Sequence, residues 1–321
     1  MRQTIAAGLF LLMLLFLPPW LRAEEPAPQE DTSPQPIQTQ QAAPEDGTGS
    51  DAAHTLRLWD GSAVQTLTAA EYLPGVVRGE MPATFELEAL KAQAVAERTY
   101  LYYRMTGGEK AAHPDADVCT DSNCCTAWLS DQYETKVQQA VAETDGQVVL
   151  YDGAPIMAVF HSSSAGSTAA SGDVWTAELP YLVSVKSPEE ADSVPNYYSV
   201  NTFTAEEFRT IFCKAHADAR LSGDCSGWVK DILLTNAGRV ASATVGGVSV
   251  TGKELRSLFG LRSAAFTVEA AGDAITFHVT GYGHGVGMSQ YGANELAKEG
   301  KNWQEILQWY YTGVMIGLYN G

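Results

Sequence analysis

The stretch Tyr72-Leu-Pro-Gly-Val-Val-Arg-Gly-Glu-Met-Pro82 decides how the fold of this chain is interpreted. Pro82 disfavours helical backbone at the residue before it, so the stretch is expected to end in an extended loop that carries Glu80. A helix is predicted to start after Thr84, which is a good N-cap residue. The buried stripe of that helix is expected to comprise Leu87, Leu90, Ala94 and Leu101.

Outward from this stretch, two hydrophobic patterns follow each other without a strict strand–helix–strand order. Alternation of apolar and polar residues predicts strands at 55–59, 64–69, 147–151, 154–160, 229–235, 240–245, 266–270 and 275–280. Helical spacing predicts further helices at 133–143, 204–212, 292–299 and 303–311. This mixture predicts the α+β fold class, with a single mixed helix/sheet domain over residues 55–321.

Residues 1–23 predict an export signal. Ile5–Leu17 is apolar and uncharged, but a helix of these residues would be about 20 Å long, less than the roughly 30 Å hydrocarbon core of a membrane. The would-be cleavage site at 21–23 lacks a small residue at its −3 position. A cleaved signal peptide and an uncleaved signal anchor therefore both stay open. Either one places the rest of the chain at the extracytoplasmic face of the cell membrane, anchored by a single pass or exported.

Residues 24–54 are predicted to form a disordered tether. They contain five prolines, five glutamines and no aromatic residue. Residues 24–51 also hold seven acidic residues and no Lys or Arg. Such a segment has too little apolar surface to offset the entropy that ordering would cost.

The composition excludes two broad classes of protein. The chain is 45% hydrophobic, so it can bury a core and is not wholly disordered. Its 20 basic and 38 acidic residues give a net charge of −18. Nucleic acids and teichoic acids bind to basic surfaces, so neither is expected as a partner.

A glycine-rich run, 281–293, is the most distinctive local motif. It follows a predicted strand and precedes a predicted helix, but its spacing fits neither a dinucleotide-binding turn nor a P-loop. Its glycines would let backbone approach a ligand closely, with His284 and Gln290 as the polar side chains. The alternative is a glycine turn that only packs inside the protein.

Several motifs in the same order resemble the stage II sporulation protein D and amidase-enhancer family. They cover nearly the whole of residues 55–321. The matching stretches are 72–82, 90–100, 160–164, 180–185, 252–256 and 281–293.

This resemblance implies a lytic transglycosylase with a groove for glycan, acting during engulfment of the forespore in sporulation. Such an enzyme cleaves the bond from N-acetylmuramic acid (MurNAc) to N-acetylglucosamine (GlcNAc) without water and leaves a 1,6-anhydro end. Strands already free of stem peptides are the implied substrate. The implied partners are peptidoglycan glycan strands, an amidase (stage II sporulation protein P) and a membrane organiser (stage II sporulation protein M).

The resemblance assigns the catalytic carboxyl to Glu80, which would serve as acid and then as base. A helix N-terminus downstream and a nearby Lys91 or Arg98 would lower the pKa of this carboxyl. A general acid needs a raised pKa, so apolar burial beside residues such as Tyr100 has to dominate.

Substrate-binding roles are expected for Lys91, Arg98 and Tyr100 within the matched helix. The alternatives are an exposed Lys91 and an Arg98 that forms a salt bridge with Glu88 or Glu97.

His161 and Ser162 are expected to line the same site. Adjacent residues on a strand point to opposite faces, so they are not interpreted as a hydrolase pair. His284 and Gln290 are expected in one cleft with Glu80.

The spacing His113-x5-Cys119-x5-Cys125 supplies one nitrogen and two sulfur ligands, which suits a structural Zn²⁺. Some sporulation members of the family carry zinc on a similar set. A disulfide is the competing interpretation, because the chain is expected to be exported. Cys124 would then be a spare thiol or exchange with Cys125.

Cys213 and Cys225 suit a disulfide better than a metal site. The sequence also departs from the family at Ala165, Ala169 and Glu97, which puts the role of the 161–168 loop in doubt.

Two rival functions stay open beside the transglycosylase. One is a non-catalytic amidase enhancer that only binds glycan. The other is a zinc-dependent glycan hydrolase with Glu80 as the base for a metal-bound water.

Overall fold

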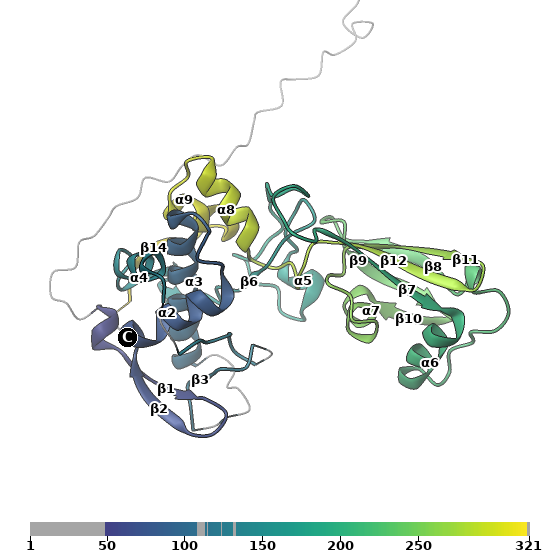
Figure 1. Ribbon diagram of the computed structural model, residues 1–321, viewed down its shortest axis with the longest axis horizontal. Helices are drawn as coiled ribbons and strands as arrows, with labels where there is room; N and C mark the ends of the chain where they lie inside the picture. Colours follow the sequence, from purple (N-terminus) through teal and green to yellow (C-terminus); the bar gives the residue numbers. More distant parts are fainter. Residues whose placement is uncertain (1–48, 108–112, 114, 123, 131–132, 320–321) are drawn as a thin grey trace, which may run out of the picture. The chain divides into compact units, whose positions relative to one another are not determined.

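The computed structural model describes residues 49–107, 113, 115–122, 124–130 and 133–319 (Figure 1). The predicted export segment and most of the predicted tether lie outside these residues. Within the described part of the chain, no helix is both long enough and apolar enough to cross a membrane.

The folded region begins earlier than the sequence predicted. Asp51–Ala53 forms a short 3₁₀ helix, η2, whose N-cap is Ser50. Asp51 is buried and pairs with Arg98, which lies far along the chain. The boundary at 54/55 is therefore wrong, because the last residues of the expected tether belong to the core.

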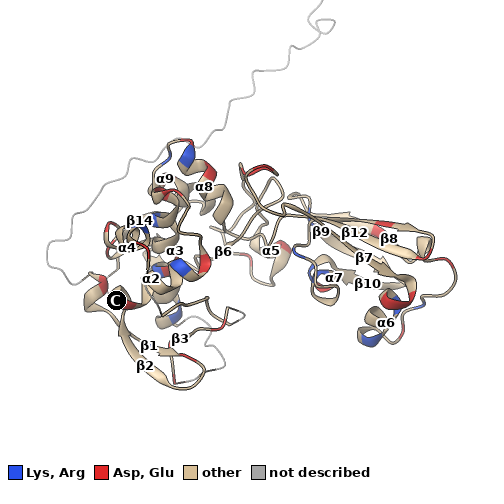
Figure 2. Cartoon of the chain, in the orientation of Figure 1, with Lys and Arg blue, Asp and Glu red and all other residues tan. Residues whose placement is uncertain are grey.

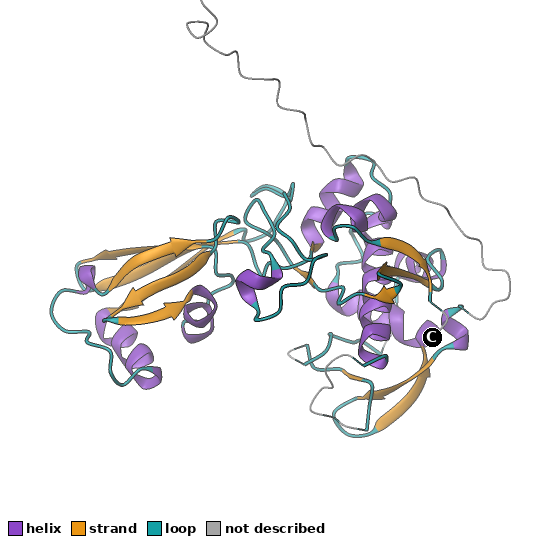
Figure 3. Ribbon diagram, turned by 180° about the vertical axis from the view of Figure 1, so that it is seen from behind, coloured by secondary structure: helices purple, strands orange, loops and turns teal. Residues whose placement is uncertain are grey.

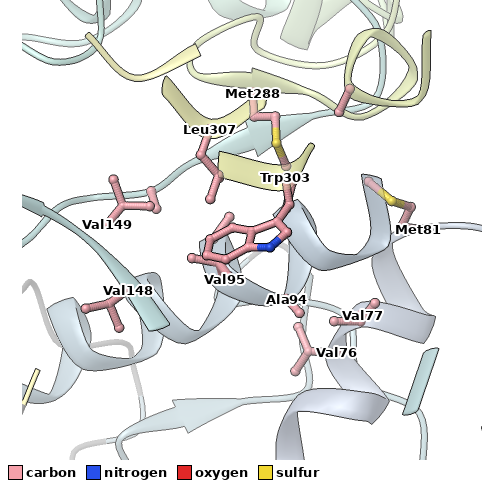
Figure 4. Close-up of a cluster of buried hydrophobic side chains, with 14 of the residues drawn as sticks. Val76, Val77, Met81, Ala94, Val95, Val148, Val149, Met288, Trp303 and Leu307 are labelled. Carbon is pink, nitrogen blue, oxygen red and sulfur yellow. The ribbon is translucent and has the colours of Figure 1, made fainter. Parts of the chain in front are cut away.

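A mainly helical core contains α2 (Ala69–Glu80), α3 (Leu87–Met105), α4 (Thr135–Ala142), α8 (Gln290–Lys298) and α9 (Trp303–Tyr310). Helix α3 is buried on almost every side, not along one stripe, because other elements surround it. Figure 4 shows part of this core, where side chains from α2, α3, β4, β13 and α9 come together around the Trp303 indole.

Short strands border this helical core. β1 (Thr55–Trp59) pairs antiparallel with β2 (Val64–Thr68) and parallel with β3 (Val118–Cys119). β4 (Gln147–Tyr151) lies between β14 (Met315–Leu318) and β5 (Ala154–Pro155). β6 (Phe160–His161) pairs parallel with β13 (Met288–Ser289), and the short helix α5 is Ser171–Val174.

A second hydrophobic core lies in a strand-rich region (Figure 3). Its elements are β7 (Tyr198–Thr204), α6 (Ala205–Ala215), η3 (Cys225–Gly227), β8 (Val229–Leu234), β9 (Val240–Val245), β10 (Val248–Thr251), α7 (Gly252–Leu258), β11 (Phe266–Ala271) and β12 (Ala274–Thr280). They form two antiparallel sheets, in the orders β10-β9-β8 and β11-β12-β7. The α+β class is confirmed, and the described residues contain two hydrophobic cores.

Glu80 ends a helix and does not lie on the extended loop that the sequence predicted. A reciprocal capping box of Thr68 and Glu71 starts α2, which continues through Pro74. Met81 then takes extended backbone, as the following proline requires. The next helix begins at residue 87, two residues later than expected.

Candidate functional site

Glu80 is held in place by two segments that are distant in sequence. The Ala127 N–H donates to Oε1 of Glu80 over 2.6 Å. The side-chain amide of Gln290, at the start of α8, donates to the main-chain oxygen of Glu80 over 3.0 Å. Both the carboxyl and its backbone are therefore held in place, and Gln290 lies beside Glu80 as predicted.

Two glycines in α2 let the loop at 126–129 lie against the helix. A Cβ at Gly79 would be 2.7 Å from the Ala127 oxygen, so any other residue would push the loop away. One turn earlier, the main-chain oxygen of Gly75 accepts from the Leu129 N–H over 3.2 Å. The Gly-x-x-x-Gly spacing of the motif thus brings the Ala127 N–H to the carboxyl.

The surroundings of Glu80 favour its protonated form. Burial raises the pKa of Glu80, and the Ala127 hydrogen bond opposes this rise. Because Glu80 is the last residue of α2, the negative end of the helix dipole also disfavours its charge. Among the described residues, no basic side chain forms an ion pair with it. The sequence predicted that a downstream helix N-terminus would lower the pKa of Glu80. Glu80 instead lies at a helix C-terminus, whose dipole acts in the opposite direction.

A second buried carboxyl, Glu97 of α3, was not predicted as part of the site. It is 2% exposed, and its Oε1 accepts from the Gln93 side chain over 3.0 Å. Burial raises the pKa of Glu97 well above its usual range, and the charge of Glu80 raises it further. The sequence offered a weak signal, because Glu97 lies at helical spacing from Leu90, Ala94 and Leu101 of the predicted buried stripe.

Arg98 is enclosed within the fold and has no exposed surface that could meet a substrate, which disagrees with its predicted binding role. Its side chain is 0% exposed, and its guanidinium donates to both Asp51 oxygens over 2.5 and 2.6 Å. The alternatives, Glu88 or Glu97 as salt-bridge partner, are also not realised. Its position in the family motif therefore serves the fold.

Lys91 and Tyr100 are more accessible than Arg98. The Lys91 ammonium bridges Glu88 and Glu143 over 2.7 and 2.6 Å. Tyr100 is partly buried, and burial raises its pKa to about 12. Their substrate-binding roles stay predictions.

His161 is buried and neutral, so it does not line an open site as predicted. Its Nδ1–H donates to the Val286 oxygen over 3.2 Å, and the Ser164 hydroxyl donates to Nε2 over 2.7 Å. Burial, followed by the neighbouring His284, lowers the pKa of His161 well below its usual range. The neighbouring Ser162 uses its main-chain oxygen to accept from the Tyr291 N–H.

The glycine-rich run fits against the protein's own chain. A Cβ at Gly287, where φ is +72°, would collide with the Val159 oxygen, and one at Gly285 would collide with the Arg239 guanidinium. The alternative of a turn that packs is thus realised at these positions. His284 lies beside Trp175, with ring centroids 5.3 Å apart. A cleft shared by His284 and Glu80 stays a prediction.

Four side chains form a cluster that could hold a metal ion. The ligand atoms of His113, Cys119, Cys124 and Cys125 all lie within 4.8 Å of one another. Cys124, expected to be a spare thiol or to exchange with Cys125, is thus part of the set. The sulfurs of Cys124 and Cys125 are 3.8 and 3.5 Å from the His113 Nε2. These distances match the edges, about 3.5–3.8 Å, of a tetrahedron with ordinary zinc bond lengths.

The expected disulfide between Cys213 and Cys225 is not formed. Among the described residues, all five cysteines are free thiols. The Cys225 sulfur instead lies 3.6 Å from the Gly272 oxygen, inside the strand-rich region.

Comparisons with known proteins place the chain in a family. Residues 60–151 match the family described as SpoIID, stage II sporulation protein. Stage II sporulation protein D of Bacillus subtilis (strain 168) is 39% identical over 266 residues, which are 79% of this chain and 76% of that protein. The Bacillus amyloliquefaciens protein of the same description is 38% identical over 268 residues, covering 79% and 75%.

A third similar protein is an amidase enhancer of Bacillus subtilis (strain 168). It is 30% identical over 296 residues, which are 77% of this chain but 40% of that protein. The chain belongs to the stage II sporulation protein D family, whose members take part in sporulation.

Proposed function

We propose that the protein is a peptidoglycan lytic transglycosylase with Glu80 as its acid–base residue. The observation that carries this proposal is a carboxyl that is partly buried, in no ion pair and raised in pKa. A raised pKa favours the protonated carboxyl, which can donate its proton to a leaving oxygen.

The reaction needs two proton transfers at one carboxyl. Protonated Glu80 gives its proton to the GlcNAc O4 as the bond from the MurNAc C1 breaks. The resulting carboxylate then takes the proton of the MurNAc C6 hydroxyl, whose oxygen closes onto C1 and forms the 1,6-anhydro ring. The Ala127 N–H stabilises the carboxylate between the two steps, since hydrogen bonds to charged acceptors are the stronger ones. No water is consumed, so no second carboxylate has to activate one.

We also propose that the His113, Cys119, Cys124 and Cys125 cluster holds a structural Zn²⁺. Three sulfurs and one nitrogen suit zinc, and four protein ligands leave no position for a reacting water. The ion would tie down the loop that continues to Ala127 and so help to aim the N–H at Glu80. A closed ligand set is evidence against the zinc-dependent hydrolase.

The cellular role that we propose follows the family. The enzyme would act at the extracytoplasmic face of the membrane during forespore engulfment, on glycan strands freed of stem peptides. The amidase stage II sporulation protein P and the organiser stage II sporulation protein M would be its partners.

The second candidate is a non-catalytic amidase enhancer, which the similarity to a protein of that description favours. Mass spectrometry of glycan incubated with the full chain separates the possibilities. Anhydro ends support the transglycosylase, new reducing ends indicate a hydrolase, and an intact polymer that is nevertheless bound indicates the enhancer.

A further inference from the structure

A small cavity of ≈ 60 Å³ lies apart from the contacts that fix Glu80. It is lined by side chains from α5 and its C-cap, the β8–β9 connection, α7 and the glycine-rich run. The residues that matter for its chemistry are Trp175, Thr235, Arg239, Lys253, Arg256 and His284. Figure 2 shows basic positions on α7 in blue, although the chain as a whole carries a charge of −18.

Three of the lining residues are basic, and none has an acidic partner. In the part of the chain that the structure describes, Arg239, Lys253 and Arg256 form no ion pair. Asp173 also lines the cavity, but it is exposed and paired with none of them. Glu254, the acid next to Lys253, pairs with His216 instead. The chain therefore gathers positive charge here without neutralising it.

Arg239 is the buried member of this group, at 3% exposed. Its Nη2 donates to the Gly283 oxygen over 2.8 Å, whereas its Nη1 is buried without a partner. Burial, followed by the charge of Arg256, lowers the pKa of Arg239 to about 10. A buried donor is costly when it is unpaired, so an acceptor that comes from outside the chain is expected.

The other wall of the cavity is aromatic and uncharged. Burial lowers the pKa of His284 to about 4, so its ring is neutral at physiological pH. Its Nδ1 accepts from the Val286 N–H over 3.1 Å, which fixes the ring beside Trp175. Trp175 is only partly buried and lines the same cavity as the three basic residues. This pairing of a ring with a guanidinium suits a sugar that carries one carboxylate.

We propose that this cavity binds the lactyl carboxylate of a MurNAc residue in a peptide-free glycan strand. This inference rests on the proposed function and adds a substrate-reading subsite to it. When an amidase removes a stem peptide, the lactyl group changes from a neutral amide to a carboxylate. A volume of ≈ 60 Å³ is enough for a carboxylate. The positive charge of the cavity would select strands that have already lost their peptides.

The test measures binding of fluorescent glycan strands to the full chain carrying Glu80→Gln, so that no cleavage occurs. Peptide-free strands are compared with the same strands after their lactyl carboxylates have been converted to methylamides. We expect the carboxylate form to bind about tenfold or more tightly, the effect of one charge-assisted hydrogen bond. Equal affinity for the two forms would overturn the inference.

Arg256→Gln removes one of the cavity's basic groups, so it should erase that difference and leave methylamide binding unchanged within about twofold. Lys214→Gln on α6 removes the same charge from an exposed position and should change neither affinity. Arg239→Gln is the second variant, in case one substitution disturbs folding. A loss that is equal for both glycan forms would count against the inference.

Competition identifies the source of the carboxylate. N-acetylmuramic acid should displace the strands, whereas inorganic phosphate at the same concentration should not; displacement by phosphate alone would contradict the proposal. This test measures binding and not cleavage. If the wild-type protein released no anhydro ends, the proposed function would be overturned, whereas the carboxylate subsite would still be supported by the binding result.

Discussion

The surroundings of Glu80 and the cavity of Arg239 are chemical opposites. Near Glu80, two carboxyls lie in buried surroundings without a cation, and Lys91 and Arg98 of α3 pair with other acids. Around Arg239, three cations lack an acid. Among the described residues, the carboxyl of Glu80 and the guanidinium of Arg239 both lack a partner of opposite charge. The first is therefore suited to proton transfer, and the second to binding an anion. Elsewhere, as at Arg98, the same fold pairs its buried charges.

The largest effect is expected when the Glu80 carboxyl is removed. Glu80→Gln keeps the side-chain shape but cannot donate or accept the proton, so cleavage should fall by more than the ~10²–10⁴-fold of a single acid–base step. Release of anhydro ends measures it. Glu71→Gln, an exposed glutamate in the same helix, is the control and should keep its activity. Turnover at the wild-type rate by Glu80→Gln would exclude Glu80 as the catalytic residue.

Two buried arginines sharpen the comparison further. Arg98→Met leaves the Asp51 carboxylate buried and unpaired, and should lower the free energy of unfolding by about 3–5 kcal/mol. Arg239→Met leaves no acid unpaired, so it should lower the free energy of unfolding by clearly less. Urea denaturation of both variants checks this. Equal losses would mean that Arg239 has a compensating partner.

Much of the fold follows from local pattern. The hairpin of β1 and β2, the strands β9 and β12, and the last two helices lie within about two residues of their predicted positions. Helix α2 was missed because Pro74 and two glycines argue against a helix locally. The reason for those glycines, a loop that lies against them, appears only in the folded chain.

The site was harder to predict than the fold. Glu80 and Gln290 were identified by motif, and the structure joins them. Arg98 was misassigned because its partner, Asp51, lies 47 residues away in a segment whose composition predicts disorder. Cys124 was set aside because spacing alone does not choose between adjacent thiols. Long-range pairing decided each of these outcomes.

The metal cluster offers a smaller but specific test. Cys124→Ser should weaken zinc binding, and a hundredfold loss of affinity would lower the unfolding free energy by about 2.7 kcal/mol. Metal content and melting temperature measure it. Because the loop continues to Ala127, activity should fall even below the melting temperature. Cys213→Ser is the matched control, and a silent Cys124→Ser would return that thiol to its spare role.

The smallest expected effect is a change in pH dependence. The pKa of Glu97 is raised on folding, so the stability it contributes is complete below its unfolded value near 4.5 and is lost as pH rises through the folded pKa. Glu97→Gln cannot ionise, so its stability relative to wild type should grow with pH, by at most about 1.4 kcal/mol per pH unit.

Melting temperatures at several pH values test this slope, with the exposed Glu206→Gln as a variant whose curve should run parallel to wild type. The charge of Glu97 also raises the pKa values of Tyr72, Tyr100 and Tyr311. These tyrosines ionise at much higher pH than Glu97 does in the unfolded chain, so they do not contribute to this slope. Parallel curves for Glu97→Gln and wild type would show that Glu97 is ionised in the folded protein.

The early start of the folded region has a mechanical consequence. Asp51 is gripped by the guanidinium of α3, and its own N–H donates to the Asp145 carboxylate over 2.7 Å. A pulling force applied to the chain before Asp51 would therefore act on the Asp51–Arg98 ion pair, and so on α3, before it acts on the hairpin of β1 and β2. Unfolding under such a force would have to break buried contacts of the core first.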